Sequence, residues 1–180
     1  MGTLKSELKK AVPVIVKATK TLHQRSIPEL YADFCQHMRD VSVIDPLGRT
    51  IVFRVENFPY LIKMQYFNEK EGKWVSALAS MAIAALANGT FDEARHKCDP
   101  ARAKGMLRIR EILTKPDSIH ENIHSRVKGE FVYVVRLGAG NIKVAFITKN
   151  EAQEWVVVTS FYSTERYLVT CAKVPAAYTK

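Results

Sequence analysis

The chain has 180 residues, of which 47% are hydrophobic, and it carries a formal net charge of +9 at pH 7. This composition excludes an intrinsically disordered chain, and the excess of positive charge favours an anionic partner such as nucleic acid. The longest apolar run, residues 74–87, is too short to span a bilayer, so no membrane partner is expected.

The first forty residues are expected to be helical. Residues 4–22 carry apolar side chains at three- and four-residue spacing, which is typical of an amphipathic helix. A second helix is predicted to begin at Ser26, because Pro28 suits its first turn and Glu29 completes a capping box. We therefore divide the chain into a helical extension, residues 1–40, and an α+β domain, residues 41–180, which together form one compact unit.

The middle of the chain predicts a hairpin and a helix. Residues 41–44 and 50–54 are rich in β-formers and flank the turn Asp45-Pro46-Leu47-Gly48. Residues 56–63 indicate a capped loop that enters a short helix. Residues 72–88 predict a longer helix, closed by Asn88-Gly89. Its spacing predicts a core-facing side made of Trp74, Leu78, Met81, Ala82 and Ala85.

The last 85 residues predict a basic helix followed by an antiparallel meander. The helix runs from Asp99-Pro100 to Lys115-Pro116. Four strands are expected after it, at residues 131–136, 141–148, 154–160 and 167–171. The predicted fold class is α+β, with N-terminal helices packed on a four-stranded antiparallel β-sheet.

Basic residues are concentrated at one place. Between Arg95 and Arg110 there are six basic residues and one acid, a density that favours phosphate contacts. The three cysteines, Cys35, Cys98 and Cys171, are far apart and form no C-x-x-C pair. They indicate a reducing compartment, and a cysteine-based zinc site is not expected.

Two motifs in this region resemble a known family. Residues 108–119 match the helix-end signature R-x-x-x-I-L-x-x-P-D-x-I, and residues 156–162 read V-V-V-T-S-F-Y. With the turn at residues 45–49 and the segment 58–63, they resemble the phage-associated branch of the barnase–EndoU–colicin–RelE nuclease superfamily. In that branch a histidine commonly precedes the long helix, and a threonine often ends the penultimate strand. His96 and Thr159 match these positions, whereas Tyr60 stands where other members carry a histidine.

The resemblance implies a barnase/RelE-like fold and metal-independent cleavage of RNA, with no cofactor. It also implies a toxin or a phage-encoded protein in the cytoplasm of a bacterial or phage-infected host cell. The expected partners are RNA and an acidic antitoxin or immunity protein.

The chemistry of such a reaction needs a base, an acid and cations around the phosphate. Imidazole titrates near neutral pH, and the cations beside His96 favour its neutral, basic form. The candidate catalytic residues are His96, Lys143, Thr159, Ser160 and Tyr162. The candidate substrate-binding residues are Arg95, Arg102, Lys104, Arg108, Arg126 and Arg136.

A second motif supports a different function. Residues 120–124 read H-E-N-I-H and match H-E-x-x-H, in which His120 and His124 of a helix would bind zinc and Glu121 would act as base. The hypotheses are therefore a metal-independent ribonuclease, a zinc peptidase, and a non-catalytic basic module that binds nucleic acid or a structural phage partner.

Overall fold

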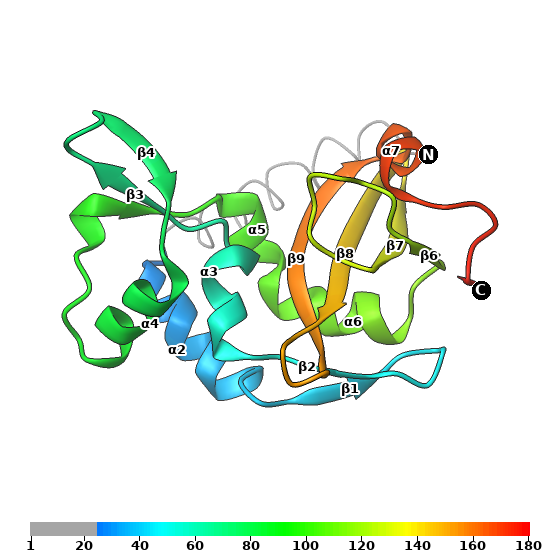
Figure 1. The fold of residues 1–180 in the computed structure, drawn as a ribbon, viewed down its shortest axis with the longest axis horizontal. Coiled ribbons are helices and arrows are strands. Elements are labelled where there is room, and N and C mark those ends of the chain that lie inside the picture. The colour runs from blue at the N-terminus through cyan, green and yellow to red at the C-terminus, as the bar shows by residue number, and fades with distance from the viewer. Residues whose placement is uncertain (1–24) are drawn as a thin grey trace, which may run out of the picture.

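The computed structural model describes residues 25–180, so the helix expected over residues 4–22 lies outside the described part of the chain. The fold is mixed α+β, as predicted, and contains a seven-stranded sheet and a three-stranded sheet (Figure 1). The small sheet lies at the left of Figure 1, with α4 and α2 below it, and the large sheet lies at the right.

The strands of the large sheet, from one edge to the other, are β1 (Ser42–Ile44), β2 (Thr50–Val52), β9 (Trp155–Thr164), β8 (Asn141–Lys149), β7 (Phe131–Gly138), β6 (Ser118–Glu121) and β10 (Tyr178–Thr179). The small sheet contains β4 (Lys73–Ser76), β3 (Gln65–Asn68) and β5 (His96–Lys97). The α-helices are α2 (Ile27–His37), α3 (Phe58–Leu61), α4 (Ala79–Ala87), α5 (Pro100–Gly105), α6 (Ile109–Thr114) and α7 (Leu168–Cys171).

Strands β6 to β9 form an antiparallel meander in which each strand pairs with the next along the chain. Strand β2 extends this meander by pairing parallel to the start of β9, with Ile51 opposite Trp155. Beyond this short pairing, α5 packs along β9. One stretch of β9 is therefore bordered by a helix instead of another strand.

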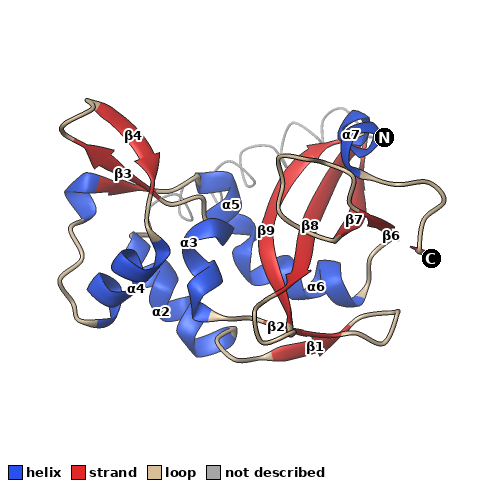
Figure 2. Ribbon diagram, in the orientation of Figure 1, coloured by secondary structure: helices blue, strands red, loops and turns tan. Residues whose placement is uncertain are grey.

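The two faces of the large sheet are covered differently. The main core combines apolar side chains of α2, α3, α5 and α6 with one face of the sheet, including Tyr133, Ala145 and Val157. Helix α6 lies behind β8 in the view of Figure 2. The opposite face carries a second cluster, including Phe146, that is covered by α7 and by side chains such as Val127 of the β6–β7 connection.

A β-bulge at Val158 decides which side chains of β9 reach each face. Val157 pairs with Ile147 and Thr159 pairs with Phe146, so Val158 is an extra residue between two successive pairs. Two residues this far apart would point to the same face of a regular strand. The bulge instead keeps Val157 in the main core and directs Thr159 to the opposite face, beside Phe146.

Several elements were predicted correctly. Ser26 caps α2, and Glu29 returns the hydrogen bond of the capping box. The hairpin β1–β2 forms around the predicted turn, and Asp99 caps α5 by accepting hydrogen bonds from the backbone N–H groups of Ala101 and Arg102.

The four-stranded sheet was wrong, because the main sheet has seven strands. Residues 167–171 form no strand: a 3₁₀ turn, Glu165–Tyr167, leads into helix α7. Strand β6 occupies residues that were not predicted to be a strand, and it pairs with β7 through Ile119 opposite Tyr133.

The predictions of the two long helices were also partly wrong. Residues 73–76, near the start of the helix predicted over residues 72–88, instead form β4, which pairs with β3. The predicted core-facing side is not buried as a unit, since Ala82 is buried but Leu78 and Met81 are exposed. The helix predicted after Asp99 is divided into α5, a 3₁₀ turn at Met106–Arg108, and α6.

A buried ion pair anchors the hairpin turn to the sheet. Asp45, 4% exposed, accepts hydrogen bonds from the N–H groups of Leu47 and Arg49, from the Arg49 side chain at 2.8 Å and from the Tyr133 hydroxyl. Burial alone would raise the pKa of Asp45, but the hydrogen bonds from Tyr133 and Arg49 outweigh it and lower that pKa. The Arg49 guanidinium in turn lies 4.0 Å from the ring centroid of Phe131.

No helix among residues 25–180 combines the length and the apolar character that crossing a membrane requires.

Candidate functional site

A cleft of about 600 Å³ lies between α3, α5, β9 and the β6–β7 connection. Four cationic side chains line it: Lys63, Arg102, Arg126 and Lys128. No carboxylate lines this cleft, and within residues 25–180 none of the four cations forms an ion pair. Uncompensated positive charge in a concave site favours binding of an anion. We call it the basic cleft.

Arg102 is the most constrained of these cations. Its Nη1 donates a hydrogen bond to Thr159 Oγ1 at 2.9 Å, and its guanidinium carbon lies 4.9 Å from the ring centroid of Phe161. Burial lowers the pKa of Arg102, and the negative charge of Asp99 counteracts this in part. An arginine remains protonated under such a shift, so the cleft holds a fixed, partly desolvated positive charge.

Thr159 can serve both Arg102 and a ligand. Its hydroxyl oxygen accepts from Arg102, which leaves the hydroxyl hydrogen free to be donated to an anion. Other neutral polar side chains lining the cleft are Asn57, Tyr60, Ser76, Thr148 and Asn150. Tyr60 of α3 is 50% exposed, so its ring offers a surface on which a flat group can stack.

The β6–β7 connection is held in place by one side chain. The Asn122 amide donates to the carbonyl oxygens of Val127 at 3.0 Å and Gly129 at 2.8 Å, and its Oδ1 accepts from the N–H of His124. In Figure 1 this connection passes in front of β8 and β9. These hydrogen bonds fix the segment that carries two of the four cations.

His124, on the same connection, has a defined tautomer. Its Nδ1 accepts a hydrogen bond from the backbone N–H of Arg126 at 3.0 Å, so the neutral ring carries its proton on Nε2. The ring lies 5.7 Å from that of Tyr167, which in turn lies 5.4 Å from Phe161. A chain of aromatic contacts therefore links His124 to the ring over which Arg102 lies.

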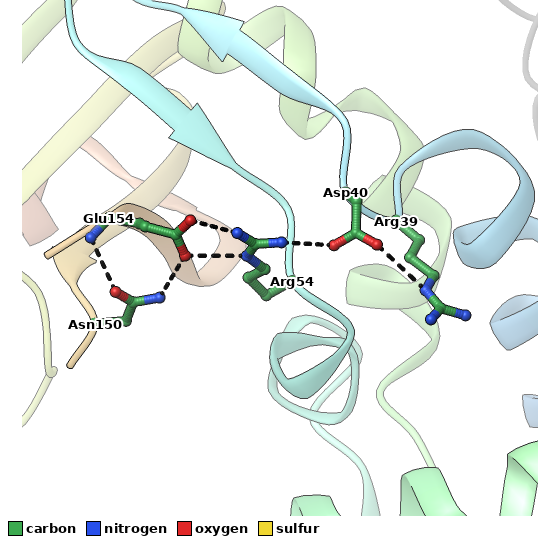
Figure 3. A network of polar contacts seen from close by, with 5 residues as sticks. All are labelled: Arg39, Asp40, Arg54, Asn150 and Glu154. Atoms are coloured by element: carbon green, nitrogen blue, oxygen red, sulfur yellow. Dashed lines mark hydrogen bonds and ion pairs between the residues drawn. The ribbon is translucent and has the colours of Figure 1, made fainter. Parts of the chain in front are cut away.

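An ion-pair network fixes one border of the cleft. Asn150, a lining residue, exchanges hydrogen bonds with Glu154, and Glu154 binds the Arg54 guanidinium in a two-point contact (Figure 3). Arg54 also pairs with Asp40 at 2.8 Å. The network joins the end of β2 to the β8–β9 turn and so supports the parallel pairing of β2 with β9.

The predicted site residues do not gather in one place. Arg95 and His96 line a separate, mainly apolar pocket of about 340 Å³ beside α4. His96 Nδ1 lies 2.6 Å from the carbonyl oxygen of Asp92, and its ring lies 4.3 Å from that of Phe91. Arg102, Arg126 and Thr159 come together in the basic cleft.

Three other candidates, Lys143 of β8 and Ser160 and Tyr162 of β9, lie on the face of the large sheet opposite to Thr159. Lys143 pairs with Tyr162 and Ala145 pairs with Ser160 across the ladder, so Ser160 and Tyr162 share the face of the main core. Ser160 is buried and donates to the carbonyl oxygen of Val144. Lys143 and Tyr162 line a pocket together with Arg108. The sheet therefore separates this group from Thr159.

The remaining candidates lie on the surface. Lys104 of α5 is exposed, and Arg136 is exposed and pairs with Glu165 at 3.3 Å. Sequence reasoning missed Tyr60, Lys63 and Lys128 as lining residues. The three-residue spacing of Tyr60 and Lys63 within a short predicted helix was the available signal for two of them.

The zinc-site prediction was wrong in its geometry. His120 and Glu121 belong to strand β6, and His124 follows in the connection, so the motif is not helical. Both ring nitrogens of His120 are used, with the carbonyl oxygen of Lys173 at 3.0 Å and with Ser118 Oγ at 2.9 Å. Glu121 pairs with Lys173 at 2.6 Å. Among residues 25–180 no group of three or more His, Cys, Asp or Glu side chains could hold a metal ion.

The buried Lys143 predicts a stability that depends on pH. Burial, with a smaller effect of Arg108, lowers the pKa of Lys143 from 10.5 to about 8. Between these two values the unfolded chain binds the extra proton, so the free energy of unfolding should rise with pH over this window. The expected gain is about 3 kcal/mol.

Urea unfolding at several pH values between 7.5 and 10.5 measures this gain. Lys143→Met is the control variant, because it removes the titrating group and should flatten the rise. An identical pH profile in both proteins would show that Lys143 does not cause it.

Comparisons of the chain with protein-family models, with curated proteins and with solved structures found no match.

Proposed function

We propose that the chain binds single-stranded RNA in the basic cleft and cleaves it without a metal ion. The observation that carries this proposal is the presence, among the described residues, of four cations and no carboxylate around one cleft floored by β9. Lys and Arg side chains that contact the phosphates of a nucleic acid release its bound counterions, and this release favours binding. The exposed ring of Tyr60 at the same cleft suits stacking of an unpaired base, which favours a single strand over a duplex.

The proposed reaction is transesterification within the RNA. The 2′-oxygen forms a bond to phosphorus, the bond from phosphorus to the 5′-oxygen breaks, and the products are a 2′,3′-cyclic phosphate and a free 5′-hydroxyl. Negative charge increases on the phosphate oxygens in the transition state. Arg102 and the Thr159 hydroxyl supply hydrogen-bond donors of the kind that stabilise this charge.

We assign the proton transfers to His124. It lies on the connection that carries Arg126 and Lys128, and aromatic contacts join it to the ring beneath Arg102. It would accept the proton of the 2′-hydroxyl and then protonate the leaving 5′-oxygen. His124 is not itself a lining residue of the basic cleft and is linked to it through Arg126 and the aromatic contacts, whereas His96, the histidine favoured by the sequence, lines a different pocket.

The proposal extends to ancestry and partners. We propose that the chain belongs to the barnase–EndoU–colicin–RelE superfamily, with the β6–β9 meander and helices α5 and α6 as the shared barnase/RelE-like unit. An acidic antitoxin or immunity protein would bind the same cleft, because its carboxylates would take the place of the RNA phosphates.

The first experiment tests cleavage without metal. We expect the purified chain to cleave a single-stranded RNA in the presence of EDTA and to leave a 2′,3′-cyclic phosphate, with binding that weakens steeply as salt is raised. A DNA oligonucleotide of the same sequence is the matched control and should remain intact, because it lacks the 2′-hydroxyl. Salt-sensitive binding without cleavage of any RNA would instead favour the non-catalytic nucleic-acid-binding module.

The same assay identifies the histidine that transfers protons. His124→Ala should lower cleavage by about a hundredfold or more, whereas His96→Ala should cleave at the wild-type rate. The reverse result would move the chemistry to the pocket of His96.

A further inference from the structure

Lys143 is a buried cation without a carboxylate partner in the described part of the chain. The residue is 5% exposed, and its Nζ has one hydrogen bond, to the carbonyl oxygen of Gly105 at 2.7 Å. Buried lysines are normally paired, since desolvating an unpaired charge is costly. The lowered pKa of Lys143, caused first by burial and then by Arg108, reflects this missing partner. The ammonium group has further N–H donors that no group within residues 25–180 uses.

A pocket of about 460 Å³ opens at this lysine. Arg108 and Lys115 add two positive charges to its lining, and Glu111 is the one carboxylate that residues 25–180 contribute there. Glu111 is engaged by the Arg108 side chain, at 3.2 Å from both Nε and Nη2. The pocket, which we call the lysine pocket, therefore has an excess of positive charge and favours an anion.

One wall of the lysine pocket is apolar. Val135, Leu137 and Ile112 supply aliphatic surface, and the Tyr162 ring lies beside Lys143, with Nζ at 4.9 Å from its centroid. Leu137 and Tyr162 are partly exposed in the structure, so this wall has surface that a ligand could cover. An aromatic ring next to aliphatic side chains suits a flat, weakly polar group.

We propose that the lysine pocket is a second ligand site, which binds a nucleoside monophosphate with its phosphate at Lys143 and Arg108 and its base against Tyr162 and Leu137. Three cations and one engaged carboxylate suit a doubly charged phosphate better than a single carboxylate. The site is separate from the basic cleft, because Lys143 of β8 and Tyr162 of β9 lie on the face of the large sheet opposite to Thr159. Its existence does not depend on the proposed RNA cleavage.

Titration calorimetry of the whole chain with adenosine monophosphate at pH 7 tests the site. We expect saturable binding that Lys143→Met weakens at least tenfold. Lys104→Met is the matched control, since Lys104 is an exposed lysine of the neighbouring helix that lines neither site, and it should bind as the wild type does. Arg108→Gln provides a second variant on the exposed rim and should also weaken binding. Absence of saturable binding by the wild type overturns the proposal.

Three further binding measurements locate the ligand: one with a variant of the basic cleft and two with parts of the ligand. Arg102→Gln alters the basic cleft and should leave binding of adenosine monophosphate unchanged; loss in this variant, with retention in Lys143→Met, would overturn the assignment to the lysine pocket. Inorganic phosphate and adenosine should each bind more weakly than the joined molecule. Equal binding of phosphate would exclude the role of the apolar wall, and equal binding of adenosine would exclude the role of the cations.

Discussion

Replacing Arg102 by alanine should lower RNA cleavage by about a hundred- to a thousandfold, the loss that follows deletion of a donor to a developing oxyanion. The guanidinium is fixed by Thr159 Oγ1 at 2.9 Å and lies over Phe161, so it meets a phosphate in a set orientation. The substitution removes one hydrogen bond and one cation–π contact, which should cost the fold only about 1–2 kcal/mol. Single-turnover cleavage rates, with thermal unfolding measured on the same samples, separate the two effects.

Lys104→Ala is the control for charge alone. Lys104 lies two residues further along α5 and is exposed, but it does not line the cleft. It should weaken RNA binding modestly, through lost phosphate attraction, and should leave turnover unchanged. If Arg102→Ala cleaves RNA within twofold of the wild-type rate, the basic cleft is not the reaction centre.

The largest loss of stability is expected from Asp45→Ala, at about 3–5 kcal/mol. The substitution leaves the Arg49 guanidinium largely buried without its carboxylate and removes the acceptor of the Tyr133 hydroxyl. Arg49 Nη2 already has no hydrogen-bond partner in the described part of the chain, so no second acceptor is available to it there. Urea unfolding at pH 7 measures the difference in the free energy of unfolding.

Asp40→Asn is the matched comparison, because Asp40 also pairs with an arginine, but at the surface, and Asn tolerates the positive φ of 58° at this position. Exposed pairs contribute little, so its loss should stay within about 1 kcal/mol. The pKa of Asp45 is lowered below 3.8 in the folded chain, so its contribution is complete above that pH and is lost as the pH falls through the folded value. Equal losses for the two variants would mean that Asp45 is not a buried anchor.

Elements with local signals were predictable from the sequence. Ser26 and Glu29 encode a cap that forms wherever the helix packs, and the turn at Asp45 follows from Pro and Gly at fixed positions. Strand β6 carries no such signal: Ser118–Glu121 is short and has one apolar residue, Ile119, and it becomes a strand because β7 and β10 pair with its two edges. The helix predicted over residues 72–88 rested on apolar spacing that includes Trp74, but Trp74 and Val75 are β-formers, and residues 73–76 pair with β3.

The break after α5 lies at Gly105, the last residue of that helix. Glycine weakens a helix, so Gly105 was a local signal that the prediction of a single helix passed over. A Cβ at Gly105 would lie 2.6 Å from Lys143 Nζ, so the glycine also permits the close approach of the lysine to its carbonyl oxygen. The two residues are 38 positions apart in sequence, so this contact has no local signal.

The sequence predicted several residues of the candidate site correctly, but it did not predict how the candidate residues are arranged in space. Arg102, Arg126 and Thr159 do line one cleft, and the basic segment that suggested phosphate contacts supplies Arg102. Thr159, Ser160 and Tyr162 were grouped as hydroxyl donors at the end of one strand, yet adjacent side chains of a strand point to opposite faces. His96 was chosen for the family resemblance and for its cationic neighbours, but β5 places it in the small sheet, away from the strand that carries Thr159.

The extra residue at Val158 also sets where the length of this chain can change. The flanking pairs, Ile147 with Val157 and Phe146 with Thr159, would stay matched in a chain that lacked it, so Thr159 and Tyr162 would keep their faces. The basic cleft would lose the Val158 side chain from its lining. Loss of a residue between Thr159 and Tyr162 would instead turn part of the strand over and place side chains of one face on the other. Shortening of β9 at Val158 therefore changes one apolar lining residue and keeps the sheet register.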